Sequence, residues 1–528
     1  MKKLKRVLSL VLSAVAAFSF AACGGGDAGI DDGVTSIDNS ANGGIGATGH
    51  LNITFFEGGY GRQWLVNALD RFCAKKNGLA TYELNADPNT TSTATTQMKS
   101  GKNIADIYMV QSGAWPEWVS RGYLENLDAV YDGKIQTSKG ETTVKEYMQD
   151  DFVDQYRMQR IYGQGQASAW VMPWAMTQIG IVYNEDILLK TKHTTAKAGA
   201  WKVGDTWTAP PESMADMLAY CADLNAVNIT PIVFPGAGSH WLRYFIQVWW
   251  AQYQGVYEEN TANVAADAGC FYDFWNFGDE NVWNQEGIKV GIDTLQSLLI
   301  DTNKGEYKNV SKDVASYSVQ DSEREFVLGN AAMLFGGSFM YNEITDFIDQ
   351  NNDGVDDISF KMMNIPYIDN ALKNENGEVE TINYYYTEEF MFIPKGANDK
   401  ALAKEFLIYL SSEECVAEFA KYTGTLRPFE CNPQEVYGDT VEFNQFTRSV
   451  FDIYDNTDIH LVTGPAGVPP EERSIISIYK GTTLHLNGSM PWATFAANLK
   501  TMNSTTLMAE VQKLTKTDYQ KWIKEYGG

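Results

Sequence analysis

The chain has 528 residues, of which 41 are Lys or Arg and 67 are Asp or Glu, giving a formal net charge of −26. This acidic balance excludes a nucleic-acid partner, which needs a basic surface, and argues against tight contact with anionic lipid headgroups. The length predicts several domains, and the aromatic content of 13% is high for a chain whose hydrophobic content is an ordinary 44%.

The N-terminus has the pattern of an export signal. A basic start is followed by the apolar run Val7–Ala22, which is too short to span a membrane as a helix. Small residues then lead directly into Cys23 and three glycines, and this junction resembles a bacterial lipobox, in which the cysteine is lipidated and the chain is cut just before it. The alternative is an ordinary signal peptide with a chance cysteine. We expect residues 1–22 to be a signal peptide and Cys23 to carry acyl chains that tie the protein to a membrane surface.

Residues 23–50 are predicted to form a flexible tether after the lipidated cysteine. They are rich in Gly, Asn, Ser and Asp and hold few large apolar groups, so they cannot build a core. The folded part is expected to start at Leu51. We expect the mature protein to lie on the extracellular face of the cell membrane.

Strands alternate with helices in the next sixty residues. Residues 51–59 alternate in polarity and end in two glycines, which indicates a strand entering a loop, and residues 104–110 have the apolar pattern of a buried strand. Helical spacing of apolar residues separates them, so the pattern predicts a parallel α/β sheet. Because ligands bind beyond the carboxyl ends of such strands, residues 57–60 and 112–115 are expected near a binding site.

The same alternation continues along the chain without an internal repeat. A strand is predicted within 170–188, a strand and glycine loop within 229–240 and a helix at 241–253. A helix, a short strand and a glycine turn are predicted at 323–339, and a strand and helix within 384–424.

Six segments taken in order resemble the extracellular solute-binding proteins of ABC transporters, in particular the family that binds carbohydrates. These segments read ITFFEGG, ADIYMV, GYLENLDAVYD, PWAMTQIGIVYNEDIL, GNAAMLFGGSF and FIPKGANDKALAKEFLIYLSSEECVAEFAKYTGTLRPF. The resemblance implies an α/β fold of the two-lobed, periplasmic-binding-protein-like type (type II). Each lobe would be a mainly parallel sheet flanked by helices, with the ligand cleft at the hinge.

The resemblance also implies that the chain passes between the lobes more than once, and we expect these crossings near Val171–Thr177, near Thr387–Phe392 and after Leu426. The N-terminal lobe would then comprise residues 51–172 and 390–426, and the C-terminal lobe residues 173–389 and 427–528. Segments around 190–207, 255–285 and 345–383 are longer than the family pattern. The implied function is capture of a sugar or oligosaccharide by hinge closure and delivery to ABC permease subunits, by a protein we expect to be a monomer.

Sugar recognition needs aromatic rings for C–H faces and polar groups for hydroxyls. Four aromatic residues follow predicted strand ends or glycine loops and are candidates for the cleft, although core packing is an equal alternative for each: Trp115, Trp174, Trp241 and Phe339. Trp249 and Trp250 fall in the middle of a helix, so they are predicted to be core residues.

Polar candidates lie at loops and at the expected crossings. Glu57 follows the first strand, where Gly58 allows a close backbone approach. One of Glu388 and Glu389 is expected to bind ligand, with Glu388 preferred. The alternative for each charged group is a solvated loop position. The remaining candidates are Tyr60, Gln111, Gln178, Ser338 and Arg427.

One acidic loop has the spacing of a calcium site. Its candidate ligands are Asp349, Asn351, Asp353, Val355 (through its carbonyl) and Asp357. Phe360 stands where an EF-hand carries Glu, so a plain Asn/Asp/Gly turn is the competing interpretation. If calcium binds here, titration of the metal will raise the melting temperature of the parent protein but not of Asp353→Ala, whereas equal shifts would rule the site out.

Catalytic signatures are missing from the sequence. It has no HExxH, GxSxG or GxxxxGK[ST] motif, its five histidines lack metal-ligand spacing, and the five cysteines after Cys23 form no disulfide or zinc pattern. A secreted glycoside hydrolase with two cleft carboxylates and a peptide-binding receptor remain the alternatives. We predict a non-catalytic binding protein that requires no cofactor, with calcium as a structural option.

Overall fold

The structure is a computed structural model. It describes residues 46–160, 165–238, 240–256, 269–272, 284–350, 358–374, 376–386, 388–462 and 488–526. The predicted signal peptide, Cys23 and most of the tether lie outside the described residues, as does most of the acidic loop.

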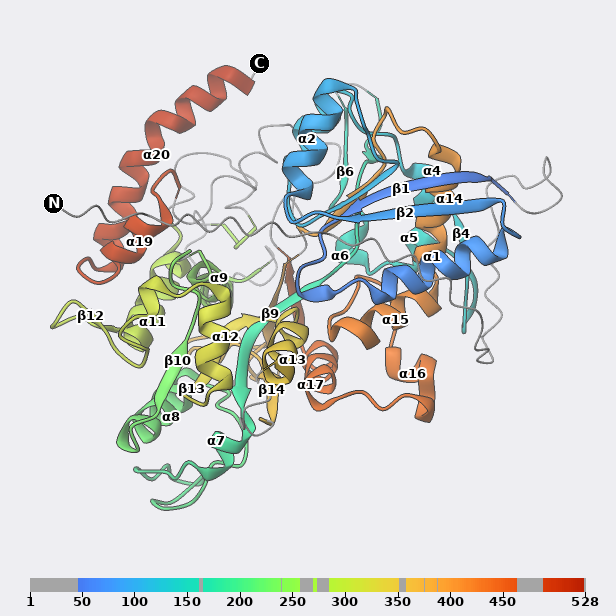
Figure 1. The fold of residues 1–528 in the computed structure, drawn as a ribbon. Coiled ribbons are helices and arrows are strands. Elements are labelled where there is room, and N and C mark those ends of the chain that lie inside the picture. Colours follow the sequence, from blue (N-terminus) through green and yellow to red (C-terminus); the bar gives the residue numbers. More distant parts are fainter. Residues whose placement is uncertain are drawn as a thin grey trace, which may run out of the picture. The chain divides into compact units, whose positions relative to one another are not determined.

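The first lobe is built on a five-stranded sheet in the order β2-β1-β3-β16-β8. The strands β1 (Gly49–Phe55), β2 (Ala80–Ala86) and β3 (Ile107–Val110) are parallel, whereas β16 (Phe390–Phe392) and β8 (Met172–Pro173) run antiparallel to their neighbours. Helices α1 (Gln63–Lys75) and α2 (Thr90–Ser100) lie on opposite sides of this sheet (Figure 1).

Alternating side chains along the strands fill two separate cores, one on each face of the first sheet. Ile107 and Met109 of β3 face α1, α14 (Lys400–Leu410) and α15 (Glu413–Thr423), whereas Tyr108 and Val110 face α2 and α3 (Trp115–Ser120). This follows from the two-residue period of a strand. Burial on both faces explains why the sequence of β3 is a continuous apolar run.

The second lobe is built on a sheet in the order β10-β13-β9-β15-β17, with β14 also paired to β9. The strand bounds are β9 Thr177–Asn184, β10 Thr230–Val233, β13 Ala331–Gly337, β14 Phe360–Met363, β15 Ile382–Tyr386 and β17 Ile459–Val462. Among the strands that the structure describes in this sheet, only the β10–β13 and β15–β17 pairs are parallel. The sheets are therefore mixed rather than mainly parallel, because the strands that lead between the lobes run against their neighbours.

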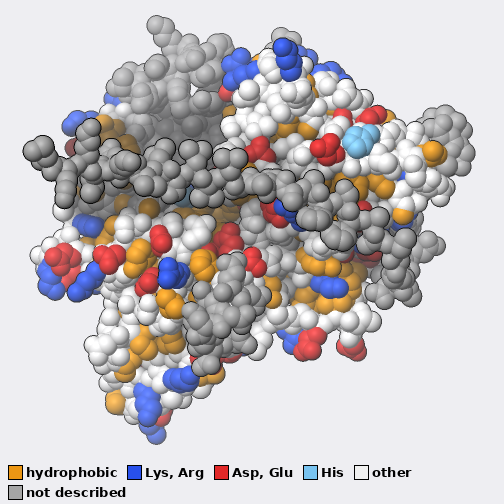
Figure 2. Space-filling model, in the orientation of Figure 1, with side chains coloured by type: hydrophobic (Ala, Val, Ile, Leu, Met, Phe, Trp, Pro, Cys, Tyr) orange, Lys and Arg blue, Asp and Glu red, His pale blue; other side chains and the backbone are white. Residues whose placement is uncertain are grey.

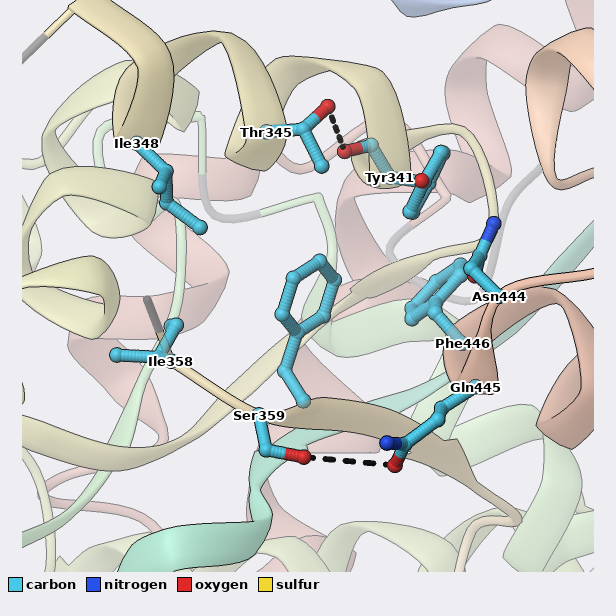
Figure 3. Close-up of a pocket in the computed structure, with 9 residues that line it drawn as sticks. Tyr341, Thr345, Ile348, Ile358, Ser359, Asn444, Gln445 and Phe446 are labelled. Carbon is cyan, nitrogen blue, oxygen red and sulfur yellow. Dashed lines mark hydrogen bonds between the residues drawn. The ribbon is translucent and has the colours of Figure 1, made fainter. Parts of the chain in front are cut away.

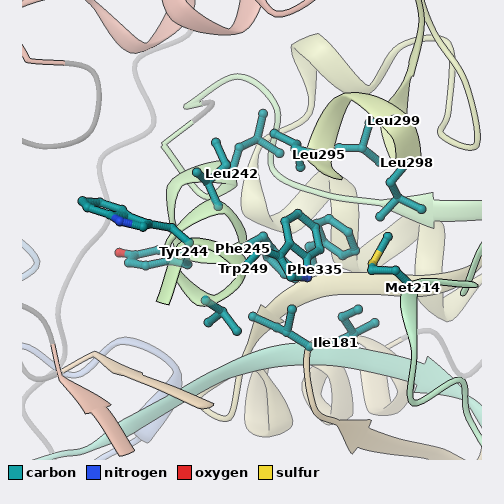
Figure 4. Close-up of a cluster of buried hydrophobic side chains, with 14 of the residues drawn as sticks. Ile181, Met214, Leu242, Tyr244, Phe245, Trp249, Leu295, Leu298, Leu299 and Phe335 are labelled. Carbon is teal, nitrogen blue, oxygen red and sulfur yellow. The ribbon is translucent and has the colours of Figure 1, made fainter. Parts of the chain in front are cut away.

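Helices cover both faces of the second sheet. On one face Phe245 of α9 (Leu242–Gln254) stacks on Phe335 with ring centroids 3.9 Å apart, and Trp249 packs beside them (Figure 4). Trp249 and Trp250 are fully buried, as predicted from their mid-helix positions. The helices around this sheet are α8 (Met214–Ala226), α11 (Glu286–Leu299), α12 (Val319–Val327), α13 (Met340–Gln350), α17 (Gln445–Asp455), α19 (Trp492–Asn498) and α20 (Ser504–Tyr526).

The chain passes from the first sheet to the second between Pro173 and Thr177 and returns between Tyr386 and Phe390. A third passage was expected directly after Leu426, but the structure places it later. Residues after Leu426 stay with the first lobe, because Phe429 pairs with Met148 and α16 (Pro433–Tyr437) packs on α15. The next helix, α17, packs on β14 of the second sheet.

Shorter elements complete the described part. They are η2 Gly58–Tyr60, α4 Asp128–Tyr131, β4 Lys134–Thr137, β5 Gly140–Thr143, α5 Val144–Tyr147, α6 Asp150–Val153, β6 Arg157–Met158, β7 Ser168–Ala169, α7 Glu185–Lys190, β11 Ile300–Asp301, β12 Glu306–Tyr307, η5 Val314–Ser316 and η6 Gly438–Thr440. Within the described residues, each helix is too short or too polar to cross a bilayer. Acidic and basic side chains are interspersed over the face shown in Figure 2.

Candidate ligand-binding site

A cavity of about 180 Å³ lies where the two lobes meet. The first lobe contributes the loop after β1 and one residue after β3. The second lobe contributes β9, α12, α13 and the start of α9, and the β15–β16 connection supplies the rest. The lining residues are Phe56, Gly58, Gly59, Tyr60, Gln111, Thr177, Ile179, His240, Trp241, Tyr244, Val319, Gln320, Phe339, Glu343, Tyr386 and Glu389.

Aromatic rings from both lobes form much of the cavity wall. Trp241 and Phe339, both predicted from the sequence, lie with ring centroids 5.9 Å apart. Tyr60 of the first lobe comes within 6.5 Å of Phe339, and Tyr244 and Tyr386 meet edge to face at 6.1 Å. The arrangement offers ring faces to the C–H patches of a ligand.

The two lobes touch at the glycines after β1. A Cβ atom at Gly59 would come within 2.6 Å of the backbone oxygen of Phe339, so only glycine permits this approach. The Asn342 amide of α13 donates to the Gly59 carbonyl at 2.9 Å and to the Tyr422 carbonyl of the first lobe at 3.1 Å. These contacts make the loop a point at which the second lobe meets the first.

Tyr60 links the first lobe to the hinge through its hydroxyl. That hydroxyl lies 2.5 Å from the Thr177 hydroxyl and donates to the Glu389 carboxyl at 3.0 Å. Burial raises the pKa of the Glu389 carboxyl well above its usual range. Burial does the same for the pKa of the Tyr60 hydroxyl. Burial therefore favours the neutral form of both groups.

A second carboxyl, Glu343 of α13, lies beside the fully buried Glu323 of α12. Two ionised carboxylates repel each other and cannot form a hydrogen bond, so the pair is favourable only when one of them holds a proton. Burial, together with the nearby Glu343 carboxyl, raises the pKa of Glu323 to about 10, and burial also raises the pKa of Glu343. Glu323 is therefore the member of the pair that holds the proton.

Five of the twelve predicted ligand-binding residues line the cavity: Gly58, Tyr60, Gln111, Trp241 and Phe339. Two more lie close by. Glu57 is half-buried and pairs with Arg62 through two hydrogen bonds of 2.8 and 2.5 Å. Glu388 accepts a hydrogen bond of 3.0 Å from Tyr386, so it lies behind the wall while Glu389 faces the cavity.

The other five predicted residues are buried away from the cavity. Trp115 is the first residue of α3, which packs against the first sheet, so its side chain lies in the core beside Tyr156. Trp174 is 1% exposed and donates to the Val110 carbonyl at 3.0 Å. The two-residue period of β9 points Gln178 to the opposite face from Thr177 and Ile179.

Ser338 and Arg427 have structural positions. Ser338 is fully buried and joins β9 to the segment after α15, since the Thr425 hydroxyl donates to its hydroxyl at 3.0 Å. Arg427 is 1% exposed, donates to the Leu410 carbonyl and lies over the Phe429 ring. Burial lowers the pKa of its guanidinium to about 10. Arg427 stays in the first-lobe core because the third passage begins later than the sequence suggested.

Several lining residues were missed in the sequence, and for some a local signal exists. Tyr244 follows Trp241 by three residues on one helix, so the two share a face. Glu343 and Val319 have no such signal, because only the packing of α12 against α13 and the first-lobe loop brings them to the cavity.

Two other cavities lack the features of this one. A cavity of about 290 Å³ between α13, β14 and the start of α17 is lined by uncharged residues, including Tyr341, Phe360 and Phe446 (Figure 3). A third, of about 750 Å³, surrounds Trp201 at the far end of the second lobe. One face of Trp201 is stacked on His193 at 4.3 Å and Lys197 lies over the ring, so the ring has no free face for a sugar.

The metal expectation remains a prediction. Among the described residues, no group of three His, Cys, Asp or Glu side chains is placed to hold an ion. Asn351, Asp353, Val355 and Asp357 lie outside the described residues, and only the backbone of Asp349 is described, at the end of α13.

The sequence matches the family model of bacterial extracellular solute-binding proteins over residues 60–415. No curated protein matches the chain. Among solved structures, a chitin oligosaccharide binding protein is 16% identical with a TM-score of 0.58, covering 90% of this chain and 99% of that one. The GacH receptor of Streptomyces glaucescens is 13% identical with a TM-score of 0.58, covering 91% and 100%. Apo RafE from Streptococcus pneumoniae is 14% identical with a TM-score of 0.58, covering 88% and 97%. These likenesses confirm the two-lobed fold.

Proposed function

The chain belongs to the family of bacterial extracellular solute-binding proteins, and we propose that its solute is a carbohydrate delivered to an ABC permease. The observation that carries this proposal is the aromatic cavity with walls from both lobes. Rings supply faces for sugar C–H groups, and carboxyl and amide groups at the same cavity supply partners for hydroxyls. The structural neighbours named for chitin oligosaccharide, raffinose and acarbose support the same ligand class.

The mechanism of ligand capture follows from the fact that both lobes contribute residues to the cavity wall. Tyr60 and Gln111 belong to the first lobe and Trp241 and Phe339 to the second, so a ligand in the cavity contacts both. Such a ligand stabilises the closed arrangement by its differential affinity for closed over open lobes. The Asn342–Gly59 contact would report closure, and release requires it to break.

The cavity volume limits what the closed form holds. Its 180 Å³ is below the roughly 300–1,000 Å³ of typical small-molecule sites. We infer that the closed lobes enclose one sugar ring, or the end of a chain whose remainder extends out of the cavity.

Export and anchoring complete the proposal. The signal-like N-terminus and Cys23 support a protein tethered to the outer face of the membrane by acyl chains. Labelling of growing cells with a radiolabelled fatty acid tests the anchor: the parent protein takes up label, and Cys23→Ala does not.

The carbohydrate proposal is tested with purified protein against a glycan panel. We expect a saccharide to raise the melting temperature without being converted, because ligand that binds only the folded state stabilises it. Product formation would instead favour the glycoside hydrolase alternative, and stabilisation by peptides alone would favour the peptide receptor.

Trp241→Ala is expected to weaken binding of the identified saccharide by about 1–3 kcal/mol, or about 5- to 150-fold. The indole is half-buried and lines the cavity, so its loss removes a stacking face without opening the core. Titration calorimetry measures the change. Trp201→Ala, a tryptophan of similar burial outside the cavity, is the matched control and should retain parental affinity. Equal affinity of Trp241→Ala and parent would place the ligand elsewhere.

A further inference from the structure

Three carboxyl groups lie at the cavity or directly behind its wall: Glu323 and Glu389 are buried, and Glu343 is half-buried. Glu389 is 2% exposed, and its second oxygen, Oε2, has no hydrogen-bond partner. The same holds for one oxygen of Glu343 and for both oxygens of the fully buried Glu323. Glu343 and Glu389 line the cavity directly. Within the described residues, no ion pair involves any of the three.

The nearest basic groups are engaged elsewhere. Arg243 of α9 donates to the Tyr244 hydroxyl at 2.8 Å and lies over that ring, and the nearby charge of Glu388 helps to raise its pKa. Arg62 is bound to Glu57. The titratable groups around Glu343 and Glu389 are Tyr60, His240, Tyr244, Glu323, Asp346, Tyr386 and Glu388. Arg243 interacts with Tyr244, Tyr384, Tyr386 and Glu388 of this surrounding.

The aromatic wall around these carboxyl groups favours a positive charge. Ring faces attract cations, and they do so more strongly where water is excluded. A neutral sugar would leave the carboxyl groups either ionised and uncompensated, which is costly in a buried site, or protonated. A cation satisfies both the ring faces and the unpartnered oxygens.

We propose that Glu343 and Glu389 bind a protonated amine of the ligand, so that the solute is a carbohydrate with a basic amino group. This inference rests on the proposed carbohydrate function and names its substrate class. Glu323 acts behind Glu343 as a proton-holding neighbour, and the rings of the wall enclose the ammonium group.

The proposal fixes the sign of the pH dependence. Burial raises the pKa of both carboxyl groups and so favours their protonated form before a ligand binds. An ammonium ion stabilises their ionised form, so binding releases protons to solvent. The affinity therefore rises with pH until the amine of the ligand itself loses its proton. A neutral sugar bound by protonated carboxyl donors would show the opposite trend.

The test compares saccharides that differ only in the charge of one nitrogen. Chitosan disaccharide and glucosamine carry a free amine, whereas chitin disaccharide and N-acetylglucosamine carry the neutral acetylated form. Binding to the purified protein is measured by titration calorimetry at pH 6, 7 and 8, in two buffers of different ionisation enthalpy. We expect the amine forms to bind at least tenfold tighter at pH 7, with release of protons and an affinity that rises from pH 6 to 7.

Isosteric variants locate the effect. Glu343→Gln and Glu389→Gln should each reduce the preference for the amine form over the acetylated form at least tenfold. Glu306→Gln, at an exposed position on β12, should keep the full preference. Melting curves show whether each variant is folded, and the loss of proton release gives a readout that general destabilisation does not produce.

The outcomes separate this inference from the proposed function. Equal or tighter binding of the acetylated or uncharged sugars overturns the inference and leaves the carbohydrate function intact. Binding of choline or spermidine, with no saccharide of either kind bound, overturns the carbohydrate function. If none of the probes binds, the assignment of an amino sugar as the ligand is wrong.

Discussion

Trp174→Ala is expected to destabilise the folded protein by about 3–5 kcal/mol, the usual cost of truncating a buried large aromatic side chain. The side chain is 1% exposed and lies in the passage between the two sheets. Its ring meets Tyr60 edge to face at 4.9 Å and lies 6.1 Å from Trp64. The substitution also leaves the Val110 carbonyl without the 3.0 Å hydrogen bond from the indole. The melting temperature and the urea midpoint measure the loss.

The same variant separates two roles for this tryptophan. Because Trp174 supports Tyr60, which lines the cavity, ligand binding should also weaken, but only together with the loss of stability. Trp174→Phe retains a ring against Tyr60 and should recover part of the stability. A variant with parental melting temperature and urea midpoint but no binding would contradict this assignment and return Trp174 to the ligand-contacting role suggested by the sequence.

Strand positions were predictable because each strand leaves a local pattern. Residues 51–55 alternate and 107–110 are continuously apolar, and these patterns reflect burial of one face and of both faces of a sheet. The direction of strand pairing leaves no such pattern. The sequence therefore gave no sign that β16 runs against β3, or that residues after Leu426 remain with the first lobe.

The sequence predicted a cavity residue correctly only where a residue that follows a predicted loop also lies at the cavity. Trp241 and Phe339 follow glycine loops that end at the cavity, whereas Trp115 follows a similar signal and turns into the core with α3. Successive side chains of a strand point to opposite faces, so Gln178 faces away from the cavity although its neighbours Thr177 and Ile179 line the wall. Glu343 reaches the cavity only through tertiary packing, which no local spacing encodes.

Glu323→Gln is expected to flatten the pH dependence of stability. The folded-state pKa of Glu323 is raised to about 10, chiefly by burial, whereas an unfolded glutamate titrates near about 4.3. The contribution of this group to stability is therefore fully present below pH 4.3 and is lost as pH rises toward 10. Between these values the folded state keeps a proton that the unfolded chain releases, at a cost of at most about 1.4 kcal/mol per pH unit.

Glutamine keeps a donor toward Glu343 but has no proton to lose, so its contribution is independent of pH. Glu323→Gln should match the parent near pH 5 and be increasingly more stable than the parent from pH 6 to 9, as measured by urea midpoints at each pH. The exposed Glu306→Gln should follow the parental curve. Parallel curves for Glu323→Gln and parent would mean that Glu323 titrates normally and that Glu343 is not held beside a neutral carboxyl. Any fall of stability with pH that remains in Glu323→Gln measures the contribution of Glu343 and Glu389. Burial raises the pKa values of these two groups as well, so they act in the same direction.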